Sequence, residues 1–301
     1  MLLQQIINGI TIGSMYAMVA IGYSMVFSVL ELVNLANGSM FMIGAYFAVF
    51  FLSVFAVGGA QFASGGMIVL ALLIALVLSG VLGLLLERFS LRGLRRRGAP
   101  KLASLISSLG MSIAIDNAVL LLFGGASKPF PRLFNWGSIH IGNAIVQSTQ
   151  IVILVVGAVL MTALSIVVYK TKIGKAMLAT AQNNEVSKLM GININMIIAI
   201  TFVISGVLAC VSGILYGSYY ASLDTGIGSD FSIKVFASAI LGGIGSLPGA
   251  VVGGLVIGVI ETIVAGYISV GYRNTIAFVI LVVMLLFRPQ GLFGQKQINK
   301  V

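Results

Sequence analysis

The sequence predicts an all-α, polytopic membrane protein with about eight transmembrane helices and one short or re-entrant half-helix. Hydrophobic residues make up 59% of the 301 residues, charged residues only 8%, and the mean hydropathy is +1.13. In soluble domains roughly a quarter of the residues are charged. Apolar runs recur to the end of the chain, and a bilayer core about 30 Å thick needs only ~20 apolar residues per helix. The whole chain, 1–301, is expected to form a single transmembrane domain.

Basic residues gather in three short segments, and this clustering predicts how the chain is oriented. The net charge is +10, and thirteen of the seventeen Lys and Arg residues lie in these segments: Arg88, Arg92, Arg95, Arg96, Arg97, Lys101; Lys170, Lys172, Lys175, Lys188; Arg288, Lys296, Lys300. Cytoplasmic loops are enriched in Lys and Arg, so all three segments are placed on the cytoplasmic face. No base-reading side chains accompany the arginine run, which favours lipid headgroups over nucleic acid as its partner.

The first five apolar runs carry the chain from an outside N-terminus to the second basic segment. They cover residues 3–28, 39–57, 66–87, 102–123 and 146–169. Three crossings end at the first basic segment, and the next two lead out and back. There is no basic stretch before the first run, so it is not interpreted as a cleavable signal sequence.

The segment 124–146 is the largest loop on the predicted outer face. It contains Trp136 together with Phe130 and Phe134, which are expected to anchor the loop in the headgroup layer, with docking of an external partner as the alternative. His140 is the only histidine in the chain, so a multi-histidine metal site is excluded.

The second half of the chain needs an extra inward segment to place its C-terminus in the cytoplasm. Residues 192–220 lead out, and 249–270 and 273–288 are the two obvious remaining spans. The stretch 231–247 must therefore also travel inward, although it is short and ends in helix-breaking glycines and a proline. We interpret it as a short or re-entrant half-helix buried in protein, because irregular backbone cannot face lipid.

A polar break separates the first two runs. Glu31, Asn34, Asn37 and Ser39 interrupt residues that are otherwise apolar or small. Capping of the next helix is the first interpretation of Asn37 and Ser39, because such side chains accept hydrogen bonds from the first amides of a helix. The alternative is a translocation path, in which Asn34, Asn37, Ser39 and free helix amides receive the carboxylate of a zwitterion.

The remaining ionisable residues do not form a catalytic site. The seven acidic residues are scattered, and no phosphate-binding P-loop pattern is present, so this chain cannot itself hold ATP in a P-loop. Glu261 and Lys234 are expected to form a buried structural ion pair; an ion-coupling role is the alternative. Asp116 falls where a helix nears the outer surface. Cys210 is the only cysteine, so no intrachain disulfide can form.

Glycines spaced by four residues predict close helix packing. Such pairs occur at Gly213 and Gly217, at Gly254 and Gly258, and along Gly245, Gly249 and Gly253. Small residues at this interval let helix backbones approach each other in lipid. Packing within the subunit is favoured over packing across a dimer.

Several stretches of the sequence resemble LivH-type permeases of branched-chain amino acid ABC importers. These stretches are spread over the chain in the family's order: Asn8 to Gly22, Val33 to Tyr46, Leu105 to Ile113, Gly191 to Asn193 with Ala199 to Ile204, Lys234 to Ala250, and Arg288 to Gly294. The resemblance implies a multi-pass protein of a bacterial-type plasma (inner) membrane. It also implies that the chain is not an enzyme and binds no cofactor itself.

The resemblance further implies partners and a coupling segment. Family members work with a paralogous, LivM-like permease, two cytosolic, LivG- and LivF-like ATPases that bind ATP, and an extracytoplasmic binding protein that delivers branched-chain amino acids. Segment 170–191 resembles the family's cytoplasmic coupling segment and is expected to hold a short helix that an ATPase could move. An ordinary cytoplasmic loop is the alternative. The expected contact residues are Lys175, Ala179, Ala181, Gln182, Asn183, Ser187, Leu189 and Gly191, with Met190 and Lys188 beside them.

Two departures from the family pattern leave the solute open. Asn37 and Ser39 stand where the family commonly has His and Glu, and Gln182 and Asn183 stand at acidic positions of the coupling segment. Relatives of similar sequence transport urea, amides or other small solutes, so these remain alternatives to branched-chain amino acids. From another functional class, an ion-coupled secondary transporter using Glu261 and Lys234 is the main rival, and a structural membrane subunit is a more distant one.

Overall fold

The computed structural model describes residues 2–30, 32–55, 65–134, 136–141, 144–288 and 290–294. Within these residues, eight helices are long and apolar enough to span a membrane. They are Leu2–Leu30, Asn37–Phe55, Gly65–Arg96, Leu102–Phe123, Ser148–Lys170, Ile194–Tyr220, Leu247–Tyr267 and Val270–Phe287. Each corresponds to one of the eight apolar runs, which confirms the all-α, polytopic class. The orientation of the termini stays a prediction.

The chain folds as two compact units that interleave along the sequence. Unit 1 comprises Met1–Glu31, Trp136–Ile192 and Ile233–Val301, and unit 2 comprises Leu32–Asn135 and Asn193–Ser232. Helix α10 (Ile227–Gly242) contributes residues to both. At 16 residues it is too short to be counted among the eight spans, as expected for the half-helix at 231–247.

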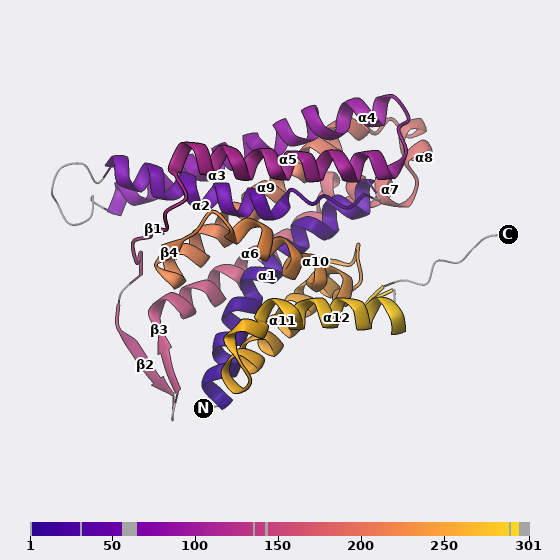
Figure 1. The fold of residues 1–301 in the computed structure, drawn as a ribbon. Helices are drawn as coiled ribbons and strands as arrows, with labels where there is room; N and C mark the ends of the chain where they lie inside the picture. Colours follow the sequence, from indigo (N-terminus) through magenta and orange to yellow (C-terminus); the bar gives the residue numbers. More distant parts are fainter. Residues whose placement is uncertain are drawn as a thin grey trace. The chain divides into compact units, whose positions relative to one another are not determined.

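Unit 1 is organised around the long first helix (Figure 1). Its elements are α1 (Leu2–Leu30), β2 (Ser138–Ile141), β3 (Ala144–Gln147), α6 (Ser148–Lys170), α7 (Lys172–Gln182), α8 (Asn184–Leu189), α11 (Leu247–Tyr267), η2 (Val270–Tyr272) and α12 (Arg273–Phe287). Helix α11 packs along α1, where Gly254 meets Ala17 and Gly258 meets Gly13. The absence of side chains at these glycines allows the two backbones to touch.

The turn after α10 is fixed to α1 by two serine side chains. Ser24 Oγ accepts a hydrogen bond from the Gly245 amide at 2.8 Å, and the Ser28 hydroxyl donates to the Gly245 carbonyl at 3.1 Å. Gly245 has a φ of +94°, a conformation that favours glycine. Beyond the turn, Gly253 lies against the Ser238 carbonyl, so α10 and α11 form a closely packed hairpin.

Unit 2 is built around helix α9. Its elements are α2 (Asn37–Phe55), α3 (Gly65–Leu86), η1 (Glu87–Leu91), α4 (Arg92–Arg96), α5 (Lys101–Phe123), β1 (Lys128–Pro129), α9 (Ile194–Tyr220) and β4 (Ser222–Leu223). Helix α3 approaches α9 where the Ser79 hydroxyl donates to the Gly206 carbonyl at 3.0 Å. Helix α2 packs on α9 where Gly213 meets the Phe41 carbonyl. The spaced glycines of both units therefore pack within the subunit.

The outer loop contains short strands that the hydropathy pattern did not predict. Strands β2 and β3 pair antiparallel as a hairpin, and β1 pairs with β4. Trp136 is 79% exposed, as an interfacial anchor requires. Phe130 is only 3% exposed and packs against Gly217, so its expected role as an anchor is corrected to that of a core residue.

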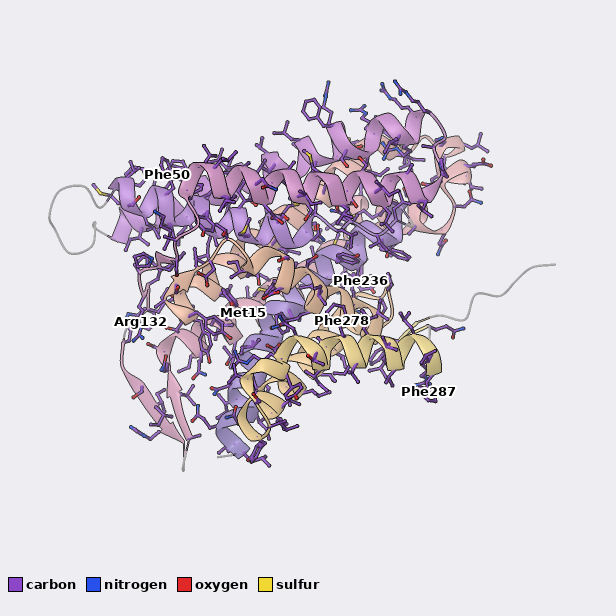
Figure 2. All side chains as sticks on the ribbon, viewed as in Figure 1. Met15, Phe50, Arg132, Phe236, Phe278 and Phe287 are labelled. Atoms are coloured by element: carbon purple, nitrogen blue, oxygen red, sulfur yellow. The ribbon has the colours of Figure 1, made fainter. Side chains whose placement is uncertain are left out.

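The helix surfaces include large apolar areas suited to lipid. Phe287, which Figure 2 shows pointing away from the end of α12, is 81% exposed, and the buried share of the α12 span is only 6%. On α5, Leu121 is 86% exposed. In a bilayer these side chains remain in a hydrocarbon environment, so their exposure carries no hydrophobic penalty.

Candidate functional site

The polar break between the first two helices lies halfway along the spans of unit 2. Asn34 shapes it: its Oδ1 accepts a hydrogen bond from the Ala36 amide at 3.2 Å, and its Nδ2 donates to Asn37 Oδ1 at 2.9 Å. The Leu35 amide donates to Ser108 Oγ at 3.3 Å. Asn34 and Asn37 are 2% and 1% exposed, so this polar turn is enclosed by protein.

Two further contacts show how deep this polar turn lies in the membrane. Ser39 Oγ lies 2.7 Å from Ser112 Oγ, and Ser112 is near the middle of α5. The Ser205 hydroxyl donates to Asn37 Oδ1 at 3.4 Å, and Ser205 is near the middle of α9. Helix α2 therefore begins near the midplane of the bilayer and not at its surface.

The hydrogen bonds bear on the two interpretations of the break. Asn37 and Ser39 bond to side chains and to the Ser112 carbonyl, and neither accepts a bond from an α2 amide among the described residues. Capping therefore does not explain these two residues. Asn37 Nδ2 is buried and has no hydrogen-bond partner in the described part of the chain. A buried amide with unused donors is costly unless something binds it.

The coupling segment of unit 1 forms two helices instead of the single short helix expected. Thr171 begins α7 by accepting a hydrogen bond from the Gly174 amide at 3.1 Å. Asn183 then begins α8, because its Oδ1 accepts bonds from the Glu185 and Val186 amides at 2.9 and 3.1 Å. The segment ends at Gly191, whose φ of +81° favours glycine.

The predicted coupling residues differ in how exposed their side chains are. Leu189 and Met190 are 86% and 78% exposed at the end of α8. Lys175, Gln182, Asn183 and Gly191 are exposed, and Ala179 and Ala181 are half-buried. Ser187 is only 3% exposed, so its side chain does not belong to the surface offered to a partner.

The capping role of Asn183 was missed because an asparagine within a helical pattern also fits an exposed helix face.

Helix α7 is attached to the spans of its own unit. Gly174 packs against the Val168 carbonyl at the end of α6. A small, largely apolar cleft lies beside α7. It is lined by Met25, Ser28, Val29, Val168, Tyr169, Met177, Leu178, Ala181, Gly245 and Leu247. A force on α7 would therefore reach the ends of α1 and α6 and the turn before α11 through direct contacts.

Lys234 and Glu261, which the sequence analysis paired, form a buried ion pair in unit 1. Lys234 Nζ lies 2.8 Å from Glu261 Oε1, and Glu261 is 2% exposed. The Tyr16 hydroxyl donates to the other oxygen, Oε2, at 2.7 Å. Both carboxylate oxygens therefore have donors, an arrangement that fits the structural pair expected from the sequence.

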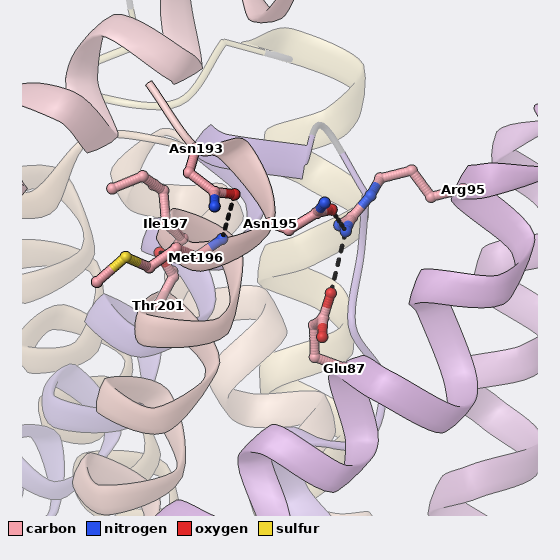
Figure 3. Close-up of polar contacts among 7 residues, drawn as sticks. All are labelled: Glu87, Arg95, Asn193, Asn195, Met196, Ile197 and Thr201. Atoms are coloured by element: carbon pink, nitrogen blue, oxygen red, sulfur yellow. Dashed lines mark hydrogen bonds and ion pairs between the residues drawn. The ribbon is translucent and has the colours of Figure 1, made fainter. Parts of the chain in front are cut away.

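A second ion pair, not predicted from the sequence, lies at the predicted cytoplasmic end of unit 2 (Figure 3). Arg95 Nη2 lies 3.1 Å from Glu87 Oε1 and donates to Asn195 Oδ1 at 2.7 Å. The Glu87 side chain is 3% exposed. Nearby, Asn193 Oδ1 accepts from the Met196 amide at 3.3 Å and begins α9. Arg95 therefore joins the first basic segment to the start of α9, in addition to any effect on orientation.

Comparisons with known proteins agree with these features. A family model described as "Branched-chain amino acid transport system / permease component" matches residues 5–287. The permease protein BraD of a high-affinity branched-chain amino acid transport system, from Pseudomonas aeruginosa, is 39% identical over 99% of this chain and 98% of its own. LivH from Escherichia coli, named in the same way, is 37% identical over 99% and 97%. A probable LivH from Methanocaldococcus jannaschii is 26% identical over 95% and 91%.

Proposed function

Because this chain belongs to the family of branched-chain amino acid transport system permease components, we propose that it is the transmembrane permease of an ATP-driven importer for branched-chain amino acids. The observation that carries the proposal is the buried polar turn at Asn34, Asn37 and Ser39, near the middle of spans that are otherwise apolar. Irregular polar backbone at this depth is typical of a translocation path.

The partners follow from the same proposal. The chain would pair with a paralogous, LivM-like permease and two LivG- and LivF-like ATPases, and would receive its solute from an extracytoplasmic binding protein. No P-loop pattern occurs in the sequence, so ATP is assigned to the ATPase subunits. The chain itself would contribute no catalytic residue and no cofactor site.

The coupling segment supplies the proposed link to the ATPases. Leu189 and Met190 form an exposed apolar pair flanked by Lys188, which suits insertion into a groove on a soluble partner. Helix α7 contacts α6 and the cleft residues of unit 1, so closure of the ATPases would displace these spans. Gln182 and Asn183 carry no charge, so the contact would depend on shape, apolar side chains and lysines.

Reconstitution into proteoliposomes tests the proposal. With both permeases, both ATPases and the binding protein, we expect uptake of labelled leucine. This uptake should require ATP on the side of the membrane that carries the ATPases. The permease alone should show no uptake under a proton or sodium gradient. Gradient-driven uptake without ATPases would overturn the importer assignment in favour of an ion-coupled transporter. Competition by urea or acetamide, but not by isoleucine or valine, would replace the branched-chain amino acid by one of the alternative solutes.

A further inference from the structure

Asp116 is a carboxylate within a transmembrane helix whose negative charge has no cationic partner among the described residues. Its Oδ1 is buried and accepts no hydrogen bond in the described part of the chain. Glu261, the other carboxylate well inside the spans, has donors on both oxygens. A charged side chain at this depth is costly, and such residues usually serve a substrate or ion.

The position of Asp116 connects it to the polar break. It lies in the half of α5 that leads to the predicted outer surface, one helical turn after Ser112, the midpoint of the helix. Ser108, Ser112 and Asp116 are spaced by four residues and therefore share one face of α5. That face meets the break, because Ser108 bonds to the Leu35 amide and Ser112 to Ser39. Asp116 therefore lies on the face of α5 that meets Leu35 and Ser39.

Hydrogen-bond donors suited to an anion lie two residues before Ser39, at Asn37. Asn37 Oδ1 is occupied by Asn34 and Ser205, and within the described part of the chain the buried Asn37 NH₂ group has no acceptor. Asn37 is also the first residue of α2, a helix of 19 residues whose first amides have no acceptor within the helix. The positive end of the helix dipole adds to this preference for an anion.

We propose that Asp116 and Asn37 bind the head group of a free α-amino acid on its way through the permease. Asp116 accepts hydrogen bonds from the ammonium group, and the Asn37 amide with the first amides of α2 donates to the carboxylate. Ser39 lies on the first turn of α2 and contacts Ser112, one helical turn before Asp116, and so links the two half-sites. The site recognises the zwitterion, and the solute's side chain is left to other contacts. This inference rests on the proposed permease function and assigns its substrate class to named residues.

The chemistry makes a sharp distinction among solutes. Leucine carries both charges, leucinamide keeps the ammonium group and lacks the carboxylate, and 4-methylpentanoate keeps the carboxylate and lacks the ammonium group. Urea and simple amides lack both. Only a solute with both charges satisfies the unpartnered acceptor and the unpartnered donor together.

The test compares Asp116→Asn, Asp116→Glu and Asn117→Leu in the fully assembled complex. Asn117 is the neighbouring polar residue on α5 and is exposed, and its side chain donates to the Ile113 carbonyl of its own helix, so its substitution is the matched control. We expect Asp116→Asn to lower leucine uptake at least about tenfold, because a charge-assisted hydrogen bond to the ammonium group is lost. Asp116→Glu should retain part of the uptake and Asn117→Leu all of it. Wild-type uptake by Asp116→Asn would overturn the proposal.

A second measurement does not depend on turnover. The thermal midpoint of the detergent-solubilised complex is measured with leucine, leucinamide or 4-methylpentanoate. We expect leucine alone to raise it, and the increase to disappear in Asp116→Asn but persist in Asn117→Leu. Equal stabilisation by leucine and 4-methylpentanoate would overturn the assignment of Asp116.

The two proposals fail in different ways. If the wild-type complex transports other amino acids but no branched-chain ones, the solute of the proposed function is wrong, and the Asp116→Asn comparison is made with the amino acid that is transported. If it transports only solutes without an ammonium group, the head-group site is overturned while the permease function stands.

Discussion

The ammonium group of Lys234 lies 2.8 Å from a carboxylate oxygen of Glu261, inside unit 1, although 27 positions separate the two residues in the sequence. Lys234 belongs to the short helix α10 and Glu261 to the spanning helix α11. The pair therefore joins the two arms of the hairpin in addition to the glycine contacts near its turn.

Replacing one member of this pair should destabilise the protein more than replacing both. Glu261→Gln leaves Lys234 as a buried charge and is expected to cost about 3–5 kcal/mol. The double variant Lys234→Met with Glu261→Leu removes both charges and should recover most of that loss. Thermal unfolding followed by size-exclusion fluorescence measures the effect. If the double variant is no more stable than Glu261→Gln, the pair is not what stabilises the hairpin.

Loss of the cap on α8 should weaken coupling without preventing membrane insertion. Asn183→Ala removes the acceptor for two backbone amides and should destabilise α8 by about 1 kcal/mol. Leu189 would then be held less firmly in the position from which it is proposed to contact the ATPase, so ATP-driven uptake should fall. Asn184→Ala, at the exposed neighbouring position, is the control and should behave as wild type. Equal uptake by Asn183→Ala and wild type would show that α8 order is not needed.

The exposed end of α8 allows a stronger test of the same surface. Leu189→Asp places a charge where an 86% exposed leucine is proposed to enter an apolar groove. We expect association with the ATPases, measured by co-purification, to be lost, whereas Leu189→Met should retain it. Co-purification of Leu189→Asp in normal yield would move the ATPase contact elsewhere on the segment.

Arg95 should matter for stability beyond its contribution to orientation. Arg95→Ala leaves the Glu87 carboxylate buried at the end of α3, with an expected cost of about 3–5 kcal/mol. Arg96→Ala is the matched control, because Arg96 is exposed and its substitution removes the same charge. Thermal midpoints of the two variants distinguish the roles. Equal midpoints would mean that the Glu87 contact contributes nothing measurable.

The spans were predictable because hydropathy reports burial in lipid regardless of tertiary contacts. Contacts between distant residues were not. Ser39 and Ser112 are 73 residues apart, and Arg95 and Asn195 are 100 apart, so no local pattern connects them. Lys234 and Glu261 could be suggested as a pair because charged residues are so rare in the spans.

The depth of the polar break could not be derived from the sequence either. A run of polar residues between two apolar runs has the same appearance at a membrane surface and near its midplane. Its position depends on Ser112 and Ser205 being its neighbours, because both lie in the middle of long helices. The surroundings of Asp116 are hidden for the same reason, because the sequence indicates where α5 ends but not which residues lie beside it.

The predicted orientation can be tested with single cysteines, because Cys210 is fully buried and should react slowly. His140→Cys places an exposed thiol on strand β2, and Lys188→Cys places one on α8. A membrane-impermeant maleimide applied to right-side-out vesicles should label the first variant and spare the second, because lysine-rich segments stay in the cytoplasm. Inside-out vesicles should give the opposite result. Labelling of Lys188→Cys from outside would place α8 on the outer face, where it cannot contact a cytosolic ATPase. Both the predicted orientation and the proposed coupling role would then be wrong.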